Sequence, residues 1–460
     1  MQNVCVIGAG AAGLTAAKHS IQQGLNVVVF EQIDQPGGTW VYSENTQCHS
    51  SMYTDLKTNL PKEAMMYENA PFPDDKPSFL DHQDVLDYLV KYAEGLPIKF
   101  NHKVTRVTRE EEKWRVEVEH QNSTSSGLYD ILFVCNGHYF DPRIPLEHSR
   151  FKGRTLHSHD YRKASEFYGQ KVLIIGAGPS GIDIALQLAK QNTQVALVSR
   201  KAEYTGLPEC ITQYAVHVAE ITEYGAITAD GKEITDIETI IFCTGYNMKF
   251  PFLSSEIIEL KAEDQMVSPL FEHVVHIKYP KSLYFIGLNL VAITFPLFEC
   301  QVRMALAFAL GKSELPSQKE LENFEDEWME RQKKRGLGPK RFHELSSEQW
   351  TYTYDINNYA LRPYKLEYIK FLSEIYAFYE KLFHFLLNEQ WSYMERLAEL
   401  GGFSLWDHLI KIRAIFNYLV EAKRQDVINY KNVDFELKPD SDDAPFIVKK
   451  GFRISRRNFE

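Results

Sequence analysis

The sequence predicts an α/β protein in which one parallel-sheet domain is inserted into another and a helical region follows. Two observations carry this prediction. A strand, a glycine-rich loop, a helix and a strand occur in that order twice, and the last third changes to helical, aromatic-rich sequence. At 460 residues the chain also exceeds a single ordinary hydrophobic core. We expect a first domain part over residues 1–162, the inserted domain over 163–280, and the completing part with the helical C-terminal region over 281–460.

The first pattern stands at the start of the chain. Val4–Ile7 is a continuous apolar run, as expected of a parallel strand that is buried on both faces. The loop GAGAAG, residues 8–13, follows, and a helix is predicted from there to about Gln23. A second apolar strand, Val27–Phe30, leads to Glu31 and completes a strand–helix–strand unit.

The same pattern returns in the middle of the chain. The apolar run Val172–Ile175 leads into the loop GAGPSG, residues 176–181. A helix is predicted to about Gln191, and the strand Val195–Val198 ends at Ser199 and Arg200. One such glycine motif is weak evidence, but two copies in the same structural setting are strong evidence.

Glycines at this spacing, between a strand and a helix, have specific physical purposes. The first forms a tight turn, the second lets the backbone approach a pyrophosphate, and the third lets the helix pack on the strand. The free N–H groups at the helix N-terminus then bind phosphates. The two copies therefore predict two Rossmann-like, dinucleotide-binding domains. Their candidate cofactor contacts are Gly8, Gly10, Ala11, Ala12 and Gly13 in the first loop, and Gly176, Gly178, Pro179, Ser180, Gly181, Ile182 and Asp183 in the second.

The residue at the end of the second strand distinguishes the two ligands. Glu31 and Ser199 lie at the same distance from the first glycine of their motifs, where the adenosine ribose is expected. A carboxylate accepts hydrogen bonds from ribose hydroxyls and repels a 2′-phosphate. Ser199, Arg200 and Lys201 supply a hydroxyl and two cations, which suit a 2′-phosphate. We therefore predict FAD, or NAD, at the first site and NADP(H) at the second.

Two further strands extend the predicted sheets. Tyr129–Asn136 and Thr239–Thr244 each lead into a glycine, which allows close approach of backbone to a cofactor. The first fold is expected to resume near residues 281–299, which makes the second domain an insertion. Pro316 to Arg335 predicts a charged amphipathic helix.

Composition excludes several classes of function. The formal net charge of −11 argues against a nucleic-acid partner. No apolar run has the roughly 18–20 residues that span a bilayer, and no signal peptide precedes the first strand. We therefore expect no membrane anchor and a cytoplasmic location, with secretion after removal of a signal peptide as the alternative. The 6 cysteines form no CxxC or Cys/His cluster, so neither a disulfide framework nor a metal site is expected.

Five further segments resemble the motifs of flavin-containing monooxygenases, the class B flavoprotein monooxygenases. Phe151–Tyr161 reads FKGRTLHSHDY and matches the family fingerprint FxGxxxHxxx(Y/F). Gly37–Trp40 resembles GGxW, and Leu56–Glu63 resembles LxTNxPKE. Phe242–Tyr246 resembles FATGY with cysteine for alanine, and Pro296–Gln301 resembles PLxExQ. The motifs stand in family order over about the first 305 residues.

The departures from the family narrow the resemblance. The chain lacks the hydrophobic C-terminal tail of membrane-anchored animal members, and so looks more like shorter members such as insect N-oxygenases. The fingerprint ends in Tyr161, whereas Baeyer–Villiger monooxygenases usually end theirs in tryptophan. This favours oxidation of a heteroatom over oxygen insertion beside a ketone.

The resemblance implies a reaction cycle and a set of residues. NADPH reduces FAD, O₂ gives a flavin C4a-hydroperoxide, and a soft nucleophilic nitrogen or sulfur accepts the distal oxygen, so the protein supplies position and shelter. Asn59 is the expected catalytic residue, because its family counterpart hydrogen-bonds the oxygenated flavin. His157 is expected to have a structural role between the domains. The remaining cofactor contacts that the resemblance implies are Gly38, Thr39, Trp40, Thr58, Leu60, Val104 and Gln301.

Alternatives remain open for the reaction and the substrate. Baeyer–Villiger oxygenation of ketones is one, and an NADPH oxidase or redox-sensing flavoprotein is another. A disulfide reductase would need a redox-active cysteine pair. The expected partner is a small amine or thioether with O₂, with an alkaloid as an analogy from insect members, and a homo-oligomer is compatible with the sequence. Aromatic residues of the helical region could form a substrate pocket or simply core: Tyr352, Tyr354, Tyr359, Phe371, Tyr376 and Phe378.

Overall fold

The structure is a computed structural model that describes residues 1–47, 49–77, 79–200, 204, 207–370, 372–373 and 376, together with three short strands near the C-terminus. It divides into two compact units, Met1–Leu400 and Gly401–Glu460. In the second unit the three strands form an antiparallel sheet. They are β21 (Phe435–Lys438), β22 (Phe446–Lys449) and β23 (Phe452–Arg453).

The first sheet of the larger unit contains seven strands, and its central part is parallel. The strands are β1 (Asn3–Ile7), β2 (Asn26–Phe30), β3 (Ile98–Lys99), β7 (Ile131–Val134), β18 (Leu270–Phe271), β19 (Val275–His276) and β20 (Leu283–Phe285). Their order is β18-β19-β20-β7-β1-β2-β3, and β18 and β19 pair antiparallel at one edge. The predicted strands at residues 4–7 and 27–30 are therefore confirmed as β1 and β2.

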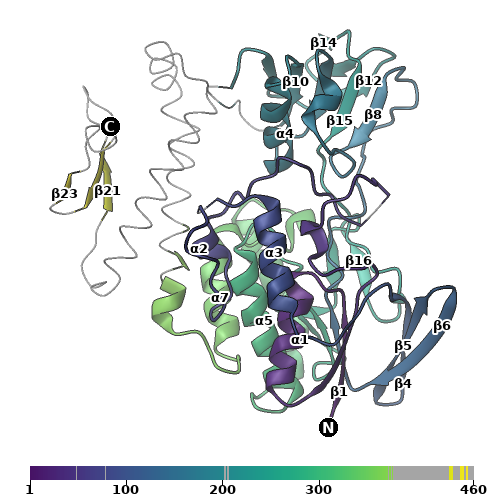
Figure 1. Cartoon of the computed structure of the whole chain (residues 1–460), viewed down its shortest axis with the longest axis vertical. Coiled ribbons are helices and arrows are strands. Elements are labelled where there is room, and N and C mark those ends of the chain that lie inside the picture. Colours follow the sequence, from purple (N-terminus) through teal and green to yellow (C-terminus); the bar gives the residue numbers. More distant parts are fainter. Residues whose placement is uncertain are drawn as a thin grey trace. The chain divides into compact units, whose positions relative to one another are not determined.

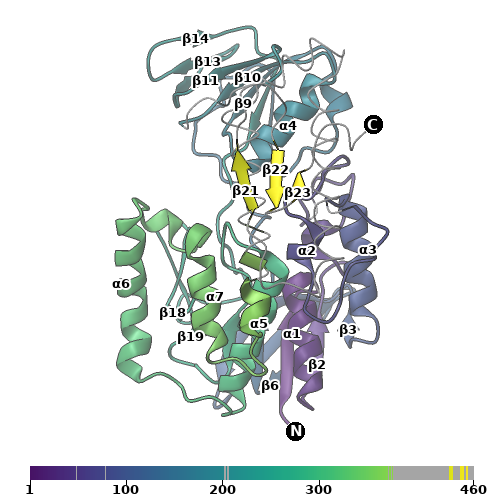
Figure 2. The ribbon, with the colours of Figure 1, turned by 90° about the vertical axis from the view of Figure 1, so that its left-hand side faces the viewer.

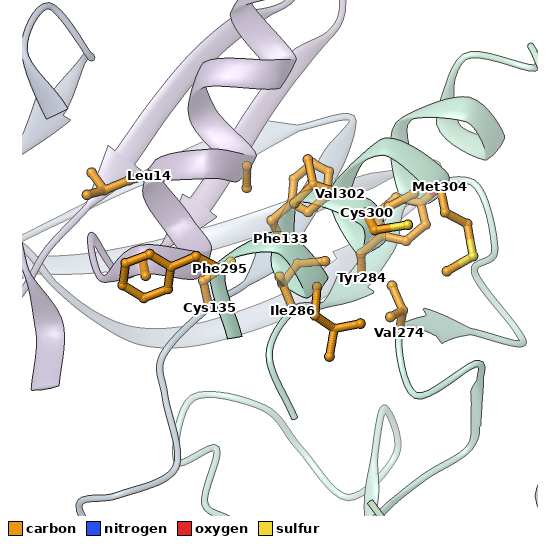
Figure 3. Close-up of a cluster of buried hydrophobic side chains, with 14 of the residues drawn as sticks. Leu14, Phe133, Cys135, Val274, Tyr284, Ile286, Phe295, Cys300, Val302 and Met304 are labelled. Carbon is orange, nitrogen blue, oxygen red and sulfur yellow. The ribbon is translucent and has the colours of Figure 1, made fainter. Parts of the chain in front are cut away.

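Helices cover this sheet and bury its apolar side chains. The helices α1 (Ala11–Gln22), α3 (His82–Ala93) and α5 (Thr294–Ala309) lie side by side over it (Figure 1). Figure 3 shows members of one buried cluster, which include Leu14 of α1, Phe295 and Val302 of α5, and the strand residues Phe133 and Tyr284. Burial of each such side chain contributes about 2 kcal/mol, so this layer holds the first glycine loop in place.

The second sheet is parallel throughout, with the order β11-β10-β9-β15-β8. Its strands are β8 (Arg154–His157), β9 (Lys171–Ile175), β10 (Gln194–Val198), β11 (Ile211–Tyr214) and β15 (Thr239–Phe242), and α4 (Pro179–Ala189) follows β9. The second strand–helix–strand unit is thus confirmed. The predicted strand Thr239–Thr244 corresponds to β15, and Tyr129–Asn136 to β7, each shorter than expected.

Two strand placements were not foreseen from the sequence. β8 pairs with β15 in the second sheet although it precedes residue 163. β18 and β19 belong to the first sheet although they precede residue 281. Both sets are short, and short apolar runs do not reveal their neighbours. The division at 162 and 280 stays a prediction.

Smaller elements complete the larger unit. The helices α6 (Gln318–Lys334) and α7 (Gln349–Asn357) lie near the edge strands β18 and β19 (Figure 2). Ser317 and Glu320 form a capping box at the start of α6, which confirms the predicted amphipathic helix. Among the described residues no helix is long and apolar enough to cross a membrane. The other elements are α2 (Lys62–Met65), β4 (Lys103–Glu110), β5 (Lys113–His120), β6 (Ser123–Tyr129), β12 (Val218–Ile221), β13 (Ala226–Thr228), β14 (Glu233–Ile234), β16 (Glu259–Lys261), β17 (Met266–Ser268), and the 3₁₀ turns at Gly38–Trp40, Ala164–Phe167, Pro339–Arg341 and Ser346–Glu348.

Candidate active site

The first glycine loop has no room for side chains at its first and third glycines. Gly8 has φ +101°, and a methyl group there would lie 2.5 Å from the carbonyl oxygen of Cys135. A methyl group on Gly13 would lie 1.8 Å from the carbonyl oxygen of Gly8. Only glycine therefore allows α1 to pack this closely on β1.

The second loop repeats this geometry. Gly176 has φ +107°, and its added methyl group would lie 2.3 Å from the carbonyl oxygen of Cys243, while that of Gly181 would lie 1.9 Å from Gly176. A methyl group on Gly178, by contrast, meets no atom within 4 Å. The space beside Gly178 lies at the N-terminus of α4, where a pyrophosphate is expected.

Both glycine-loop helices begin without a side-chain cap. α1 starts after Gly10 and α4 starts after Gly178, and among the described residues no side chain caps either N-terminus. Ala11, Ala12, Pro179 and Ser180 form these first turns. Uncapped N–H groups and the positive end of the helix dipole suit a phosphate, so the residues present fit two dinucleotides.

Glu31 is held in a fixed orientation at the end of β2. Its carboxylate accepts hydrogen bonds from the backbone N–H groups of Ala9, at 2.7 Å, and Ile33, at 3.0 Å. Burial raises the pKa of Glu31 in spite of these bonds, so hydrogen bonds from ribose hydroxyls would favour its charged form. Val104, on β4, is buried in the hydrophobic cluster that also contains Phe30.

Ser199 and Arg200 occupy the matching position after β10. The backbone N–H of Ser199 donates to the carbonyl of Tyr214 at 3.0 Å, which fixes the turn, and Arg200 is exposed. An exposed cation on a fixed turn suits the 2′-phosphate of NADP(H).

We expect Arg200→Ala to raise KM for NADPH about tenfold to hundredfold. A charge-assisted hydrogen bond, such as one from Arg200 to the 2′-phosphate, contributes about 1.5–3 kcal/mol. NADH has no 2′-phosphate and cannot accept this bond. The KM for NADH should therefore change less than about twofold, as measured by steady-state oxidation of each nucleotide. Arg150→Ala is the matched control, because Arg150 is also an exposed arginine and pairs with Glu220 at the surface. Equal losses for NADPH and NADH would contradict the assignment.

The segment Gly37–Trp40 packs directly on the first glycine loop. The N–H of Gly37 donates to the carbonyl of Ala9 at 3.0 Å, and Gly38, with φ +57°, faces the Cα atom of Gly10. The 3₁₀ turn of Gly38, Thr39 and Trp40 follows. The structure thus brings this motif beside the predicted FAD pyrophosphate site.

The segment that carries Thr58, Asn59 and Leu60 is fixed by backbone contacts to Leu80. The N–H of Thr58 donates to the carbonyl of Leu80 at 2.8 Å, and the Thr58 hydroxyl accepts from the N–H of Leu80 at 3.0 Å. Thr58 is buried, so its side chain holds the segment in place. Asn59 is exposed, and no hydrogen bond among the described residues engages its amide. The amide is available to a ligand.

Gln301 is buried, and protein groups engage both ends of its amide. Its Oε1 accepts from the N–H of Gly287 at 3.1 Å, and its Nε2 donates to Asn289 Oδ1 at 2.6 Å and to Tyr352 Oη at 3.1 Å. Asn289 is also buried, and its Nδ2 has no hydrogen-bond partner among the described residues. Gln301 therefore fixes the loop after β20, and Asn289 is a polar group that the sequence patterns did not reveal.

Asp183 and His157 also have protein partners. The Asp183 carboxylate accepts from Tyr53 and Gln187. His157, at the end of β8, is buried, and its Nδ1 accepts from the backbone N–H of His159 at 3.1 Å. Burial, with the nearby His159, lowers the pKa of His157 to about 4, so the ring is neutral at pH 7. The position of His157 suits the structural role expected of it.

The described cysteines are free thiols, and the described residues contain no cluster of metal ligands. Burial raises the pKa of Cys135 and raises that of Cys243 to about 12, so both thiols stay protonated. The described cysteines are unpaired, and no group of acidic, histidine and cysteine side chains there could hold a metal ion.

The aromatic residues of the helical region are divided between core and surface. Tyr352 is buried, whereas Tyr354 is 51% exposed. Tyr359 packs against Phe271 and Phe308. Phe371 and Phe378 lie outside the described residues, and Tyr376 contacts Trp350. Core packing accounts for most of the described part of this set.

Comparison with known proteins agrees with this geometry. A family model described as "Flavin-binding monooxygenase-like" matches residues 1–206 and 204–364. The chain is 35% identical over 383 residues to "Flavin-containing monooxygenase FMO GS-OX5" of Arabidopsis thaliana, which covers 76% of this chain and 83% of that protein. The chain therefore belongs to the flavin-binding monooxygenase family.

Solved structures extend the comparison. The S-allyl-L-cysteine S-oxygenase from Allium sativum superposes with a TM-score of 0.76 at 28% identity, over 91% of this chain and 99% of that one. Tmm from Pelagibacter gives a TM-score of 0.72 at 28% identity, over 83% of this chain and 90% of that one. The protein is thus a flavin-dependent monooxygenase that uses FAD, NADPH and O₂ with a small-molecule substrate.

Proposed function

We propose that this monooxygenase transfers one oxygen atom to a soft nucleophile, a thioether sulfur or an amine nitrogen, with Asn59 at the reacting centre. The balanced reaction consumes the substrate, NADPH, a proton and O₂, and yields the S- or N-oxide, NADP⁺ and water. The Allium S-oxygenase, which this chain resembles over nearly its whole length, favours sulfur as the first substrate to test. When bound, FAD supplies the oxygen-transfer chemistry.

The observation that carries the proposal is the setting of Asn59. Its backbone is fixed through the neighbouring Thr58, while its amide is exposed and has no hydrogen bond within the described part of the chain. A carboxamide donates a hydrogen bond without releasing a proton, which suits a site that must retain a reactive oxygen species. The protein's task is to orient this donor and to exclude water.

The thiols argue against a disulfide reductase. Such an enzyme needs a thiolate beside the flavin, and a thiol with a raised pKa is a poor nucleophile. Cys135 and Cys243 follow the strands β7 and β15, next to the two glycine loops, and burial raises the pKa of both. The positions nearest the predicted cofactors therefore favour oxygen transfer.

We expect Asn59→Ala to leave FAD bound and NADPH oxidation nearly unchanged, while product per NADPH falls about tenfold or more. Loss of one oriented hydrogen-bond donor at a reacting centre costs about 3 kcal/mol. The measurement is steady-state NADPH consumption with a thioether, an amine and a ketone, with hydrogen peroxide quantified in parallel.

Asn45→Ala serves as the control, because the Asn45 side chain accepts a hydrogen bond only within its own exposed turn. Its product per NADPH should equal that of the unsubstituted protein. Unchanged coupling in Asn59→Ala would remove Asn59 from the reacting centre. An ester from the ketone would replace heteroatom oxidation with Baeyer–Villiger chemistry.

A further inference from the structure

A partly buried hydrogen bond joins the segment that carries Asn59 to the helix of the second glycine motif. Tyr53 Oη donates to Asp183 Oδ2 at 2.6 Å, across 130 residues of sequence. Tyr53 is only 6% exposed and lies six residues before Asn59 in the sequence. Asp183 lies on α4, directly after the glycine loop. The bond therefore connects the two predicted cofactor sites.

Further polar contacts surround this bond. Gln187, one helical turn after Asp183, donates from Nε2 to the same Oδ2 atom at 3.0 Å and to the carbonyl of Asp55 at 3.5 Å. Its Oε1 accepts from Tyr161 Oη at 3.0 Å. A buried polar network whose members satisfy one another fixes a single arrangement of the segments that it joins. Here it joins residues 53–55, Tyr161 and α4.

A second set of contacts, through Arg162, also holds residues 53–55. The N–H of Thr54 donates to the carbonyl of Arg162 at 2.9 Å. The buried Arg162 guanidinium in turn donates to the carbonyls of Ser43, at 2.5 Å, and His159, at 2.7 Å. Residues 53–58 thus lie between anchors at Asp183, Arg162 and Leu80, and Asn59 follows the last of them.

The charge of Asp183 is better suited to a hydrogen-bond donor than to a phosphate. A carboxylate near the N-terminus of α4 is favoured by the helix dipole, but it repels a pyrophosphate. Burial, together with the Asp183 charge, raises the pKa of Tyr53 well above its ordinary value, so the hydroxyl remains a donor. The Tyr53 hydroxyl is therefore the donor of this bond, and the Asp183 carboxylate is the acceptor.

We propose that Tyr53 and Asp183 are positioning residues that couple occupancy of the NADP(H) site to the order of the Asn59 segment. Phosphates bound at the N-terminus of α4 restrict the motion of that helix. Through the Tyr53–Asp183 bond, the same binding restricts the motion of residues 53–59. Only the last step, from the segment to oxygen transfer, rests on the proposed role of Asn59.

The test is amide hydrogen exchange of the holoenzyme with adenosine 2′,5′-bisphosphate as the probe. This compound carries the 2′-phosphate and the adenosine-side phosphate of the pyrophosphate but lacks the nicotinamide, so it cannot contact Asn59 directly. In the unsubstituted protein it should slow exchange in both α4 and residues 53–59 about threefold or more. In Tyr53→Phe it should protect α4 alone. Protection of residues 53–59 that is equal in the two proteins overturns the proposal.

Two further variants exclude a purely structural effect. Tyr284→Phe removes a similar buried hydroxyl, which donates to Pro280 at 2.9 Å within the first domain, and it should retain protection of both segments. Tyr53→Phe combined with Asp183→Ala should lose no more protection of residues 53–59 than Asp183→Ala alone, because both remove one interaction. If the double variant loses the sum of the protection lost in the two single variants, the proposal is overturned.

The product yield separates this inference from the proposed function. Tyr53→Phe should bind FAD normally and should release two- to fivefold more peroxide per NADPH than the unsubstituted protein. If Tyr53→Phe loses the protection of residues 53–59 but its peroxide yield is unchanged, the connection between the two sites is retained and the role of Asn59 is rejected. Unchanged protection rejects the connection, whatever the peroxide yield.

Discussion

Gly13→Ala is expected to abolish FAD binding, whereas Gly181→Ala is expected to abolish NADPH binding and leave FAD in place. The added methyl groups would lie 1.8 Å and 1.9 Å from the carbonyl oxygens of Gly8 and Gly176, far inside contact distance. Both obstructing atoms are backbone, so no side-chain rotation relieves the overlap. Each glycine loop must move away from its helix, and the phosphate site is lost with it.

The flavin absorbance of the purified proteins and the binding of NADPH to each measure these losses. Gly13→Ala should retain less than about a tenth of the flavin of the unsubstituted protein. Gly181→Ala should retain full flavin but show at least about a hundredfold weaker NADPH binding. Gly338→Ala is the control, since its methyl group meets no atom within 4 Å. Loss of flavin from Gly181→Ala would contradict the separation of the two sites.

The parts of the fold that follow from local sequence were predicted well. The apolar runs of β1 and β9 and their glycine loops define two strand–helix–strand units, because each unit is contiguous and its periodicity is clear. β8 was not placed in the second sheet, because four residues carry no signal of which sheet they join. Strand pairing across a long connection depends on contacts that are remote in sequence.

The contacts of the site side chains were harder to predict from the sequence than the positions of the residues. Motif register placed Asp183 and Gln301 near the cofactors, yet their polar atoms have protein partners at Tyr53, Gln187, Asn289 and Tyr352. Tyr53 lies 130 residues from Asp183, so no local pattern contains the pair. Register gives the position of a residue on a loop, whereas its contacts require the fold.

Glu299 illustrates the same point with a large expected effect on stability. It belongs to the segment Pro296–Gln301, in which the resemblance implies a cofactor contact at Gln301. In the structure it is only 3% exposed and accepts hydrogen bonds from His19 Nε2 at 2.9 Å, Arg303 at 2.8 Å and Tyr364 Oη at 2.7 Å. Glu299 therefore joins α1, α5 and the chain near residue 364.

We expect Glu299→Gln to lower the free energy of unfolding at pH 7 by about 3 kcal/mol. Burial alone would raise the pKa of Glu299, but the His19 hydrogen bond and the Arg303 charge outweigh it and lower the pKa to about 2. The ordinary value is 4.5, and each unit corresponds to about 1.4 kcal/mol, so the charged form stabilises the fold by about 3 kcal/mol. Glutamine keeps the shape and removes the more deeply buried of the two carboxylates that pair with Arg303, the other being Glu68.

The pH dependence of this loss distinguishes a charge effect from a packing effect. Because the folded-state pKa is depressed, the stabilisation by Glu299 is complete above pH 4.5 and disappears as the pH falls toward 2. Denaturation curves of the two proteins should therefore differ most near neutral pH and converge below pH 4.5. Glu322→Gln, which removes an exposed carboxylate that pairs with Gln318 on α6, should cost less than about 1 kcal/mol at any pH. A difference for Glu299→Gln that stays constant with pH would assign the loss to packing, since a cavity or a misplaced amide does not titrate.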